Sequence, residues 1–289
     1  MTPKNTHSNP SPESVRETLN IAETRYEEGK DDKALSLYNA ALEALKEIRE
    51  GSEETIELKS QALYGKIMAF SSKGLYREAF HTAEQLMDLA DVYNLPEEKY
   101  KGAINAVYNL VNGGDHAKMF NYAQKAYETA IDTGQANRQL EALTWMGVHY
   151  SLDRSYREAL VYYKKACQRI PQCTNSKLIF DLYRWLGALN SSTGSYDQAA
   201  EYYRMALKLT ENAVDKELEA LIYNDLTELY IYWEDYSEAM TYAQKSLAMA
   251  DNYQLELWKG HMYENYARIL RGLNRYEEAK QAPVKEATR

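Results

Sequence analysis

Proline is scarce in this 289-residue chain, which has six prolines, three of them within the first 13 residues. Only Pro96 and Pro171 interrupt the long stretch from there to Pro283. Because proline lacks the amide hydrogen and clashes with the preceding turn, helix interiors exclude it. We therefore expect a helical body in which Pro96 and Pro171 lie at helix boundaries.

Cysteine is also rare. Cys167 and Cys173 are the two cysteines of the chain, and their C-x5-C spacing matches no zinc or redox signature. They could form a disulfide only if the backbone brought them together. Because cytosolic chains rarely keep disulfides, we expect two reduced thiols and a cytoplasmic location.

Excess basic charge and long apolar runs are missing as well. The formal net charge is −9, and no long run of Lys and Arg exists to neutralise phosphates. No segment reaches 18 apolar residues, and the stretch 1–12 is too polar for a signal peptide. We therefore expect neither a nucleic-acid partner nor insertion into a membrane.

Catalytic motifs are absent too. The five histidines form neither an H-x-x-x-H pair nor an H-E-x-x-H helix, and there is no phosphate-binding loop and no G-x-S-x-G elbow. The run Gly113-Gly114-Asp115-His116 lies where a turn between helices is expected. We expect no enzymatic activity, no metal site and no cofactor.

What the chain does contain is a repeat rich in tyrosine, with 26 tyrosines in all. The motif Tyr-x-x-Ala recurs at a step of 40 residues. Its alanines are Ala79, Ala159, Ala199, Ala239 and Ala279. Between the first two, the step of 40 predicts the motif at residues 116–119, and the chain has His116-Ala117-Lys118-Met119 there instead. An earlier unit, out of phase, is centred on Ala34. A period of this length is typical of helical repeat proteins.

Each repeat has the same internal order. A helix with apolar residues three and four apart is followed by a short polar turn and a second helix that begins with the motif. Small residues face each other in pairs, such as Gly187 and Ala199, and Gly147 and Ala159. We expect these pairs to let two antiparallel helices approach closely.

This order of small residues, tyrosines and alanines resembles the tetratricopeptide repeat. The best-formed unit contains Trp145, Met146, Gly147, Tyr150, Tyr156, Ala159, Tyr163, Ala166 and Pro171. The resemblance implies an all-α fold, a right-handed α-solenoid of about seven antiparallel helix-turn-helix repeats. The step of 40 exceeds the family's usual 34 and is also compatible with HEAT-type repeats. Long-period arrays of this kind resemble those of peptide-sensing bacterial regulators.

The expected organisation has three parts. Residues 1–13 are expected to be a disordered leader, because they are rich in proline and polar residues. The S-x-x-E capping box at Ser14–Glu17 predicts the first helix start and opens a repeat domain over 14–282. Its units begin near 15, 60, 100, 140, 180, 220 and 260. Residues 283–289 are a tail or a truncated end, since the last second helix is cut short by Pro283.

In stacked hairpins the first helices line the concave side of the solenoid. Their groove-facing slots give the candidate peptide- or protein-binding residues Lys101, Asn105, Tyr108, Asn112, Trp145, Arg184, Trp185, Asn224, Asn265 and Arg268. The asparagines form a ladder able to grip a peptide backbone, or they bond to neighbouring helices. The two tryptophans are anchors or inter-repeat packing. The arginines bind a carboxylate or are solvated.

The function expected from this pattern is a non-catalytic scaffold that binds a peptide or protein segment. Two alternatives remain open at this point. The repeats could be the sensory module of a longer signalling protein with an output domain. They could also be a self-association module that forms a homodimer through the unfinished end. Because fold does not determine function, the residues name no partner.

Overall fold

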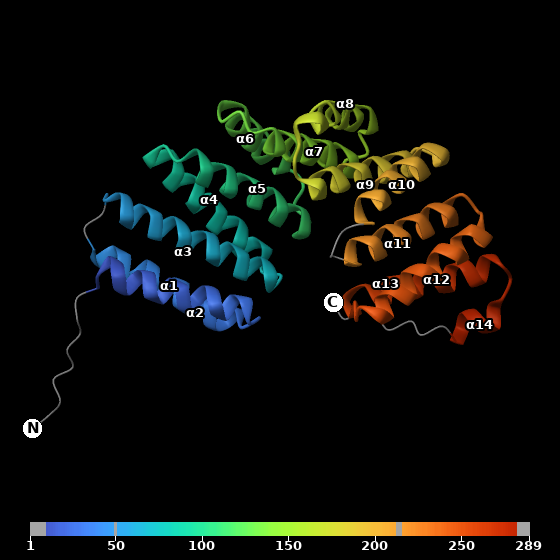
Figure 1. Cartoon of the computed structure of the whole chain (residues 1–289), viewed down its shortest axis with the longest axis horizontal. Helices are drawn as coiled ribbons and strands as arrows, with labels where there is room; N and C mark the ends of the chain where they lie inside the picture. Colours follow the sequence, from blue (N-terminus) through green and yellow to red (C-terminus); the bar gives the residue numbers. More distant parts are fainter. Residues whose placement is uncertain (1–9, 49–50, 212–215, 282–289) are drawn as a thin grey trace, which may run out of the picture. The chain divides into compact units, whose positions relative to one another are not determined.

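The computed structural model describes residues 10–48, 51–211 and 216–281. This part of the chain contains fourteen α-helices, one short 3₁₀ helix and no strand (Figure 1). The helices are α1 (Pro12–Glu27), α2 (Asp31–Glu47), α3 (Glu53–Ser72), α4 (Tyr76–Tyr93), α5 (Pro96–Asn112), α6 (Met119–Asp132), α7 (Ala136–Leu152), α8 (Tyr156–Cys167), η1 (Ile170–Gln172), α9 (Ser176–Ser192), α10 (Tyr196–Thr210), α11 (Lys216–Tyr232), α12 (Tyr236–Asn252), α13 (Glu256–Gly272) and α14 (Tyr276–Gln281).

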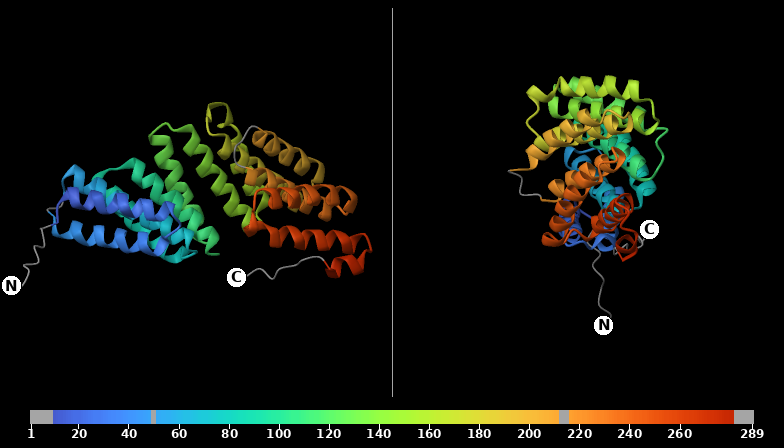
Figure 2. Two further views of the ribbon diagram at one scale, coloured as in Figure 1. Left: turned by 60° about the horizontal axis from the view of Figure 1, so that its bottom comes forward. Right: turned by 90° about the vertical axis from the view of Figure 1, so that its right-hand side faces the viewer.

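The chain divides into two compact units, residues 1–152 and residues 153–289. In the N-terminal unit, α1 packs on α2, α3 on α4, and α5 on α6 (Figure 2). Each second helix also packs on the first helix of the next pair, and α3 contacts both α1 and α5. The first helices of successive hairpins are therefore neighbours, as stacked repeats require.

The C-terminal unit follows the same plan. Helix α9 packs on α10, α11 on α12, and α13 on α14, while α11 contacts α9 and α13. The last second helix, α14, has six described residues, and the predicted tail over 283–289 lies outside the described part of the chain. Within each unit, the all-α hairpin repeat predicted from the sequence is confirmed.

The step of 40 residues is visible in the backbone of the hairpin turns. The residue that ends each turn has a positive φ of 59° to 77°, at Gly74, Gly114, Arg154, Gly194, Glu234 and Asn274. The next amide closes the turn, as where Ser195 N–H donates to the Asn190 carbonyl at 2.8 Å. This bond belongs to the Schellman type of helix end, which favours glycine at the left-handed position.

The predicted role of small residues in helix packing is confirmed at Gly187. A Cβ atom at this position would lie 2.5 Å from Cε1 of Tyr203, which is buried on the paired helix α10. At Gly65 on α3 and Gly272 on α13, the space is instead filled by the rings of Tyr38 and Tyr236, which lie on the second helix of the preceding hairpin. Tyrosine fills the core of this fold because glycine leaves room for a ring between two helices.

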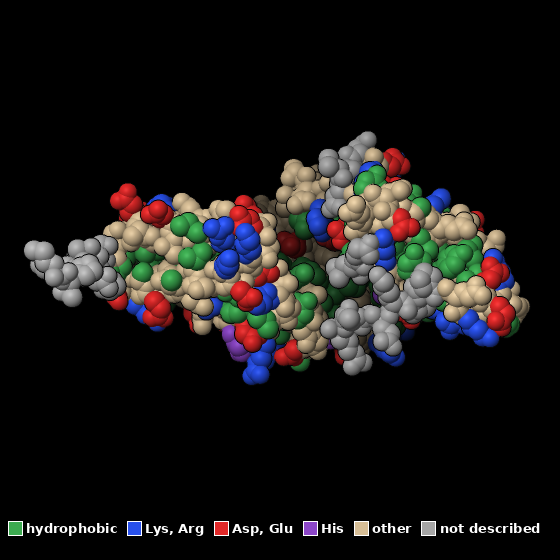
Figure 3. Space-filling view, turned by 90° about the horizontal axis from the view of Figure 1, so that it is seen from below, with side chains coloured by type: hydrophobic (Ala, Val, Ile, Leu, Met, Phe, Trp, Pro, Cys, Tyr) green, Lys and Arg blue, Asp and Glu red, His purple; other side chains and the backbone are tan. Residues whose placement is uncertain are grey.

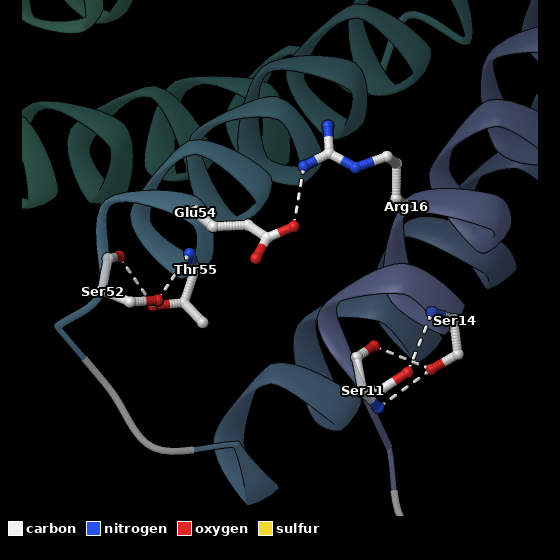
Figure 4. A network of polar contacts seen from close by, with 6 residues as sticks. All are labelled: Ser11, Ser14, Arg16, Ser52, Glu54 and Thr55. Carbon is white, nitrogen blue, oxygen red and sulfur yellow. Dashed lines mark hydrogen bonds and ion pairs between the residues drawn. The ribbon is translucent and has the colours of Figure 1, made fainter.

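The first helix starts earlier than predicted. Its N-cap is Ser11, whose side chain accepts from Ser14 N–H at 3.2 Å, while Ser14 Oγ accepts from Ser11 N–H at 3.0 Å (Figure 4). The predicted box at Ser14–Glu17 is therefore wrong, because Pro12 fits the first helical position and sets the start there. The predicted leader was too long, and its residues 1–9 lie outside the described residues.

The first helices of neighbouring hairpins are also tied together near their N-termini. Ser52 caps α3 by accepting from Thr55 N–H at 3.2 Å. One turn away, Arg16 of α1 donates to Glu54 of α3 at 3.0 Å (Figure 4). This ion pair is exposed, so it contributes little stability.

The surface mixes charges of both signs. Viewed from the side of α1 and α2, the N-terminal unit carries acidic, basic and hydrophobic side chains close together (Figure 3). None of the helices that the structure describes is both long enough and apolar enough to span a bilayer.

Candidate binding faces

In the C-terminal unit, the face formed by the first helices α9, α11 and α13 is built around charged contacts between repeats. Arg184 of α9 donates to both carboxylate oxygens of Asp225 on α11, at 2.5 and 3.3 Å. Burial raises the pKa of the Asp225 carboxyl, and the Arg184 guanidinium opposes that rise. Arg184 is thus paired within the protein, so a ligand carboxylate would compete with Asp225 for it.

The asparagines of this face bond to each other. Asn265 of α13 donates to Asn224 Oδ1 and to Glu228 Oε1 on α11, both at 3.1 Å. Its own Oδ1 accepts from Arg268 at 3.0 Å, and Asn224 also donates to Glu228 at 3.3 Å. Asn265 is only 1% exposed. Of the two roles open from the sequence, these contacts correspond to bonding between neighbouring helices.

The rim of the same face is open to solvent. Tyr232 at the end of α11 is 56% exposed, and the Arg268 guanidinium lies 5.5 Å from the centre of its ring. His261 is exposed on α13, with Nδ1 3.6 Å from Glu228 Oε1. An aromatic ring and titratable groups are therefore accessible beside the buried network.

In the N-terminal unit, an equivalent network joins α5 and α7. Tyr100 donates its hydroxyl hydrogen to Glu141 at 2.5 Å, and Arg138 donates to Glu97 at 2.5 Å. The Arg138 guanidinium also lies 4.5 Å from the centre of the Tyr100 ring. Burial and the neighbouring Glu141 carboxylate raise the pKa of Tyr100, so its hydroxyl stays a donor.

The predicted residues of α5 lie beside this network. Lys101 stands 5.6 Å from the centre of the Tyr64 ring and 3.7 Å from Glu97. The Asn105 and Asn112 amides each donate at 2.8 Å to the carbonyl four residues back in the helix. The side-chain oxygen of each of these two asparagines is left as an acceptor at the surface.

A small hollow of about 280 Å³ lies between α1, α3 and α5, the first helices of three successive hairpins. It is lined by Tyr26, Met68, Ser71, Ser72, Asn105 and Tyr108. Tyr108 is 46% exposed, which makes it the most accessible ring of this lining. The hollow therefore brings the predicted Asn105 and Tyr108 together on one face.

Trp145 and Trp185 are both half-buried, but they belong to different units, on α7 and α9. Although the two tryptophans occupy equivalent positions in the repeat, they do not lie on one surface within either unit. Both roles proposed from the sequence, packing and anchoring, stay predictions for each ring.

The bonding of the acidic residues on these faces is what sequence reasoning missed. Asp225 and Glu228 occupy groove-facing positions of the repeat, but the bonds that they and Glu141 form were not predicted. The signal that indicates most of these bonds is a spacing of 41 residues, one repeat plus one. It relates the bonded pairs Tyr100–Glu141, Glu97–Arg138, Arg184–Asp225, Glu217–Trp258 and Asn224–Asn265.

No arrangement for metal binding is found on these faces. The structure describes no group of three or more His, Cys, Asp or Glu side chains able to hold a metal ion. The chemistry that the faces do offer is hydrogen bonding and ring contact, from groups held rigidly by their neighbours.

Comparison with known proteins gives a family for part of the chain. A family model described as tetratricopeptide repeat matches residues 178–252, which span α9 to α12. No curated protein matches the sequence.

Solved structures extend the likeness to nearly the whole chain. The apo form of RapI has a TM-score of 0.65 at 14% identity, covering 93% of this chain and 97% of its own. NprR in complex with its cognate peptide NprX has a TM-score of 0.67 at 14% identity, covering 97% and 80%. Aspartyl phosphate phosphatase F from Bacillus subtilis has a TM-score of 0.64 at 15% identity, covering 97% and 84%. Residues 178–252 therefore match the tetratricopeptide-repeat family, and the chain shares the helical-repeat fold of these structures.

Proposed function

We propose that the chain is a non-catalytic scaffold that binds a peptide or protein segment along the faces formed by its first helices. The observation that carries this proposal is that first helices present the exposed rings Tyr108 and Tyr232 beside polar networks that join successive repeats, within a tetratricopeptide-repeat fold. NprR, which shares the fold, is described in complex with a cognate peptide. A Rap conjugation gene regulator of the same fold is described in complex with the Phr* peptide.

The chemistry of the faces supports a peptide as the ligand. A peptide backbone offers one donor and one acceptor per residue, which amide and hydroxyl side chains match without reading the sequence. Tyr108 and Tyr232 add exposed rings that cover apolar side chains. Behind Tyr232, the buried Asn265 holds the Arg268 guanidinium that lies over the ring, so less conformational entropy is lost there on binding.

The class of partner, the cellular location, a regulatory role and the absence of catalysis are parts of the same proposal. The partner is a protein segment rather than nucleic acid, and the free Cys167 and Cys173 favour a cytoplasmic location. NprR is described as a quorum sensor, which favours a regulatory role for the binding event. One structure of the same fold is named a phosphatase, so absence of catalysis needs its own test. Turnover of acetyl phosphate by the purified chain would contradict this part of the proposal.

The binding test starts from a display library of random short peptides selected on the full chain. We expect a selected peptide to lose at least about tenfold in affinity when Tyr108→Ala and Tyr232→Ala are combined, because exposed rings dominate such interfaces. The matched control combines Ile131→Ala and Met205→Ala, which remove similarly exposed side chains from the second helices α6 and α10. Equal losses in both double variants would rule out the first-helix faces as the site.

Self-association is the remaining alternative, and it makes a different prediction. Sedimentation of the free chain over a wide range of concentrations separates the two cases. A monomer at every concentration that still binds the selected peptide supports the scaffold. A dimer lost in the double variant of Tyr108 and Tyr232 would favour self-association through the same faces.

A further inference from the structure

A second hollow lies away from the proposed peptide site, in the N-terminal unit. It has a volume of about 630 Å³ and is formed by α2, α3 and α4. Side chains of α3 make its floor, and side chains of α2 and α4 make its two walls. We call it the outer groove.

The lining of the outer groove has helical spacing on all three sides. The floor holds Ile56, Lys59, Leu63 and Lys66, which are three or four residues apart on α3. From Ile56 to Lys66 the floor measures about 15 Å, or nearly three helical turns. Three helices with one open side offer the space of a fourth helix, in the way amphipathic helices fill grooves.

One end of the outer groove is apolar. Val92 on the α4 wall is 74% exposed, and Tyr93 beside it is also exposed. Ile56 on the floor and Leu42 on the α2 wall are half-buried. Apolar side chains gathered in this way at a surface mark a site of interaction.

Lys66 lies three turns away from Ile56, towards the other end of the groove. Its positions in the following repeats, at steps of 40, hold the buried apolar residues Ala106, Met146, Leu186 and Leu226. Lys66 is half-buried, and burial lowers its pKa. Its ammonium lies 5.5 Å from the centre of the Phe70 ring, and the described chain gives it no carboxylate within ion-pair distance.

The charges around Lys66 indicate what would complete the groove. Two acids line the walls, Glu43 on α2 and Asp88 on α4. Glu43 already forms an ion pair with Lys46 at 2.7 Å. Lys59 and Lys66 make the floor basic, in a chain whose net charge is −9. A half-buried ammonium in an apolar position is stabilised when a carboxylate reaches it.

We propose that the outer groove binds an amphipathic helix of a partner protein, with apolar residues against Val92 and Ile56 and a carboxylate on Lys66. The carboxylate and the apolar residues lie about three turns apart on this helix, to match the length of the floor. None of its lining residues belongs to the hollow around Asn105 and Tyr108, so the groove gives the scaffold a second partner.

The test uses the full chain and two synthetic helical probes. One is a fluorescein-labelled amphipathic peptide with a leucine stripe and a glutamate three turns from its centre. The other is its twin with lysine in place of the glutamate. Anisotropy titrations should give at least about tenfold tighter binding of the glutamate peptide, a difference of about 1.4 kcal/mol.

Three variants locate the binding. Lys66→Glu should reverse the preference between the two peptides, and Lys66→Gln should abolish it. Val92→Asp should weaken both peptides, because the leucine stripe loses its apolar contact. The control Lys125→Glu changes an exposed lysine on α6 and should leave the preference intact. Circular dichroism checks that each variant is folded.

Four results would overturn this proposal. Equal affinity of the two peptides, or a preference unchanged by Lys66→Glu, removes the role of the ion pair. Displacement of the glutamate peptide by decanoate at the affinity of the peptide itself would identify a site for small acyl carboxylates. A concentration-dependent dimer that Val92→Asp dissociates would identify a second copy of the chain as the occupant.

Discussion

Arg184 and Asp225 illustrate how single residues hold neighbouring repeats in register. Both oxygens of the carboxylate accept from the guanidinium, and the Asp225 side chain is more buried than that of Arg184. Removal of the Arg184 guanidinium leaves the buried Asp225 carboxylate without its partner. An uncompensated buried charge of this kind lowers the free energy of unfolding strongly. The effect is moderated because Arg184 is 38% exposed and solvent screens it.

We predict that Arg184→Met lowers the free energy of unfolding by about 1–3 kcal/mol at neutral pH. The loss should shrink as the pH falls. Without Arg184, burial raises the pKa of Asp225 further above its ordinary value of 3.8, so the folded state holds a proton that the unfolded state releases. Urea unfolding of the wild type and the variant near pH 7 and near pH 5 checks this. A loss that is the same at both pH values contradicts it.

The sequence predicted which helices carry the proposed binding face but not how its residues bond to one another. The slots of Asn224 and Asn265 were identified from the repeat phase alone. Their mutual bond was not, because it joins residues 41 positions apart and depends on the tilt between two packed helices. The pairing of Asp225 with Arg184 was missed for the same reason, since the groove-facing position of a charged residue does not identify its partner.

At the scale of elements, the hairpin turns were the most predictable feature. The polar turn and the Tyr-x-x-Ala start of the second helix give both ends of the connection, and helices begin at Tyr76, Tyr156, Tyr196, Tyr236 and Tyr276. The turn at Gly113–Gly114 was also identified correctly. The start of α1 was misjudged, because Ser11 and Ser14 both suit an N-cap and only Pro12 decides between them.

The turn positions without glycine give a prediction for stability. Glu234 is exposed and has a φ of 61°, where glycine occupies the same step at Gly194. Left-handed backbone angles cost a non-glycine residue about 1–2 kcal/mol of folding free energy. Glycine avoids this cost, but its greater conformational freedom in the unfolded chain offsets part of the gain. Glu234→Gly should raise the free energy of unfolding by about 0.5–1 kcal/mol. The reverse exchange at an equivalent turn, Gly194→Glu, should lower it, and two changes of the same sign would refute the argument.

The asparagines of the first helices separate into two kinds. Asn265 bonds to another helix and is buried, whereas Asn105 bonds to its own helix. We predict that Asn265→Ala lowers the free energy of unfolding by about 1–3 kcal/mol, because Asn224, Glu228 and Arg268 each lose a partner. Asn105→Ala should change it by no more than about 0.5 kcal/mol. Chemical denaturation followed by circular dichroism measures both, and equal effects would contradict this distinction.

At the scale of the whole molecule, stability and binding follow from the same architecture. Within the described part of each unit, hairpins pack on their neighbours in the array, so bonds between successive first helices both join the repeats and hold the side chains beside them. The proposed binding groups are therefore positioned by the stacking of the repeats rather than by any single core. This is why the repeat pattern indicates the proposed faces, while the identity of the partner depends on a few exposed side chains.

Both units present exposed rings on their first helices, and we propose that a peptide lies along these faces. A photo-crosslinking peptide tests this claim: it is selected on the full chain and carries a benzophenone at successive positions, and its crosslinks are mapped by mass spectrometry. We predict crosslinks on α3, α5, α9, α11 or α13, the first helices of their hairpins. Crosslinks confined to the second helices α2, α4, α6, α10 and α12 would contradict the claim.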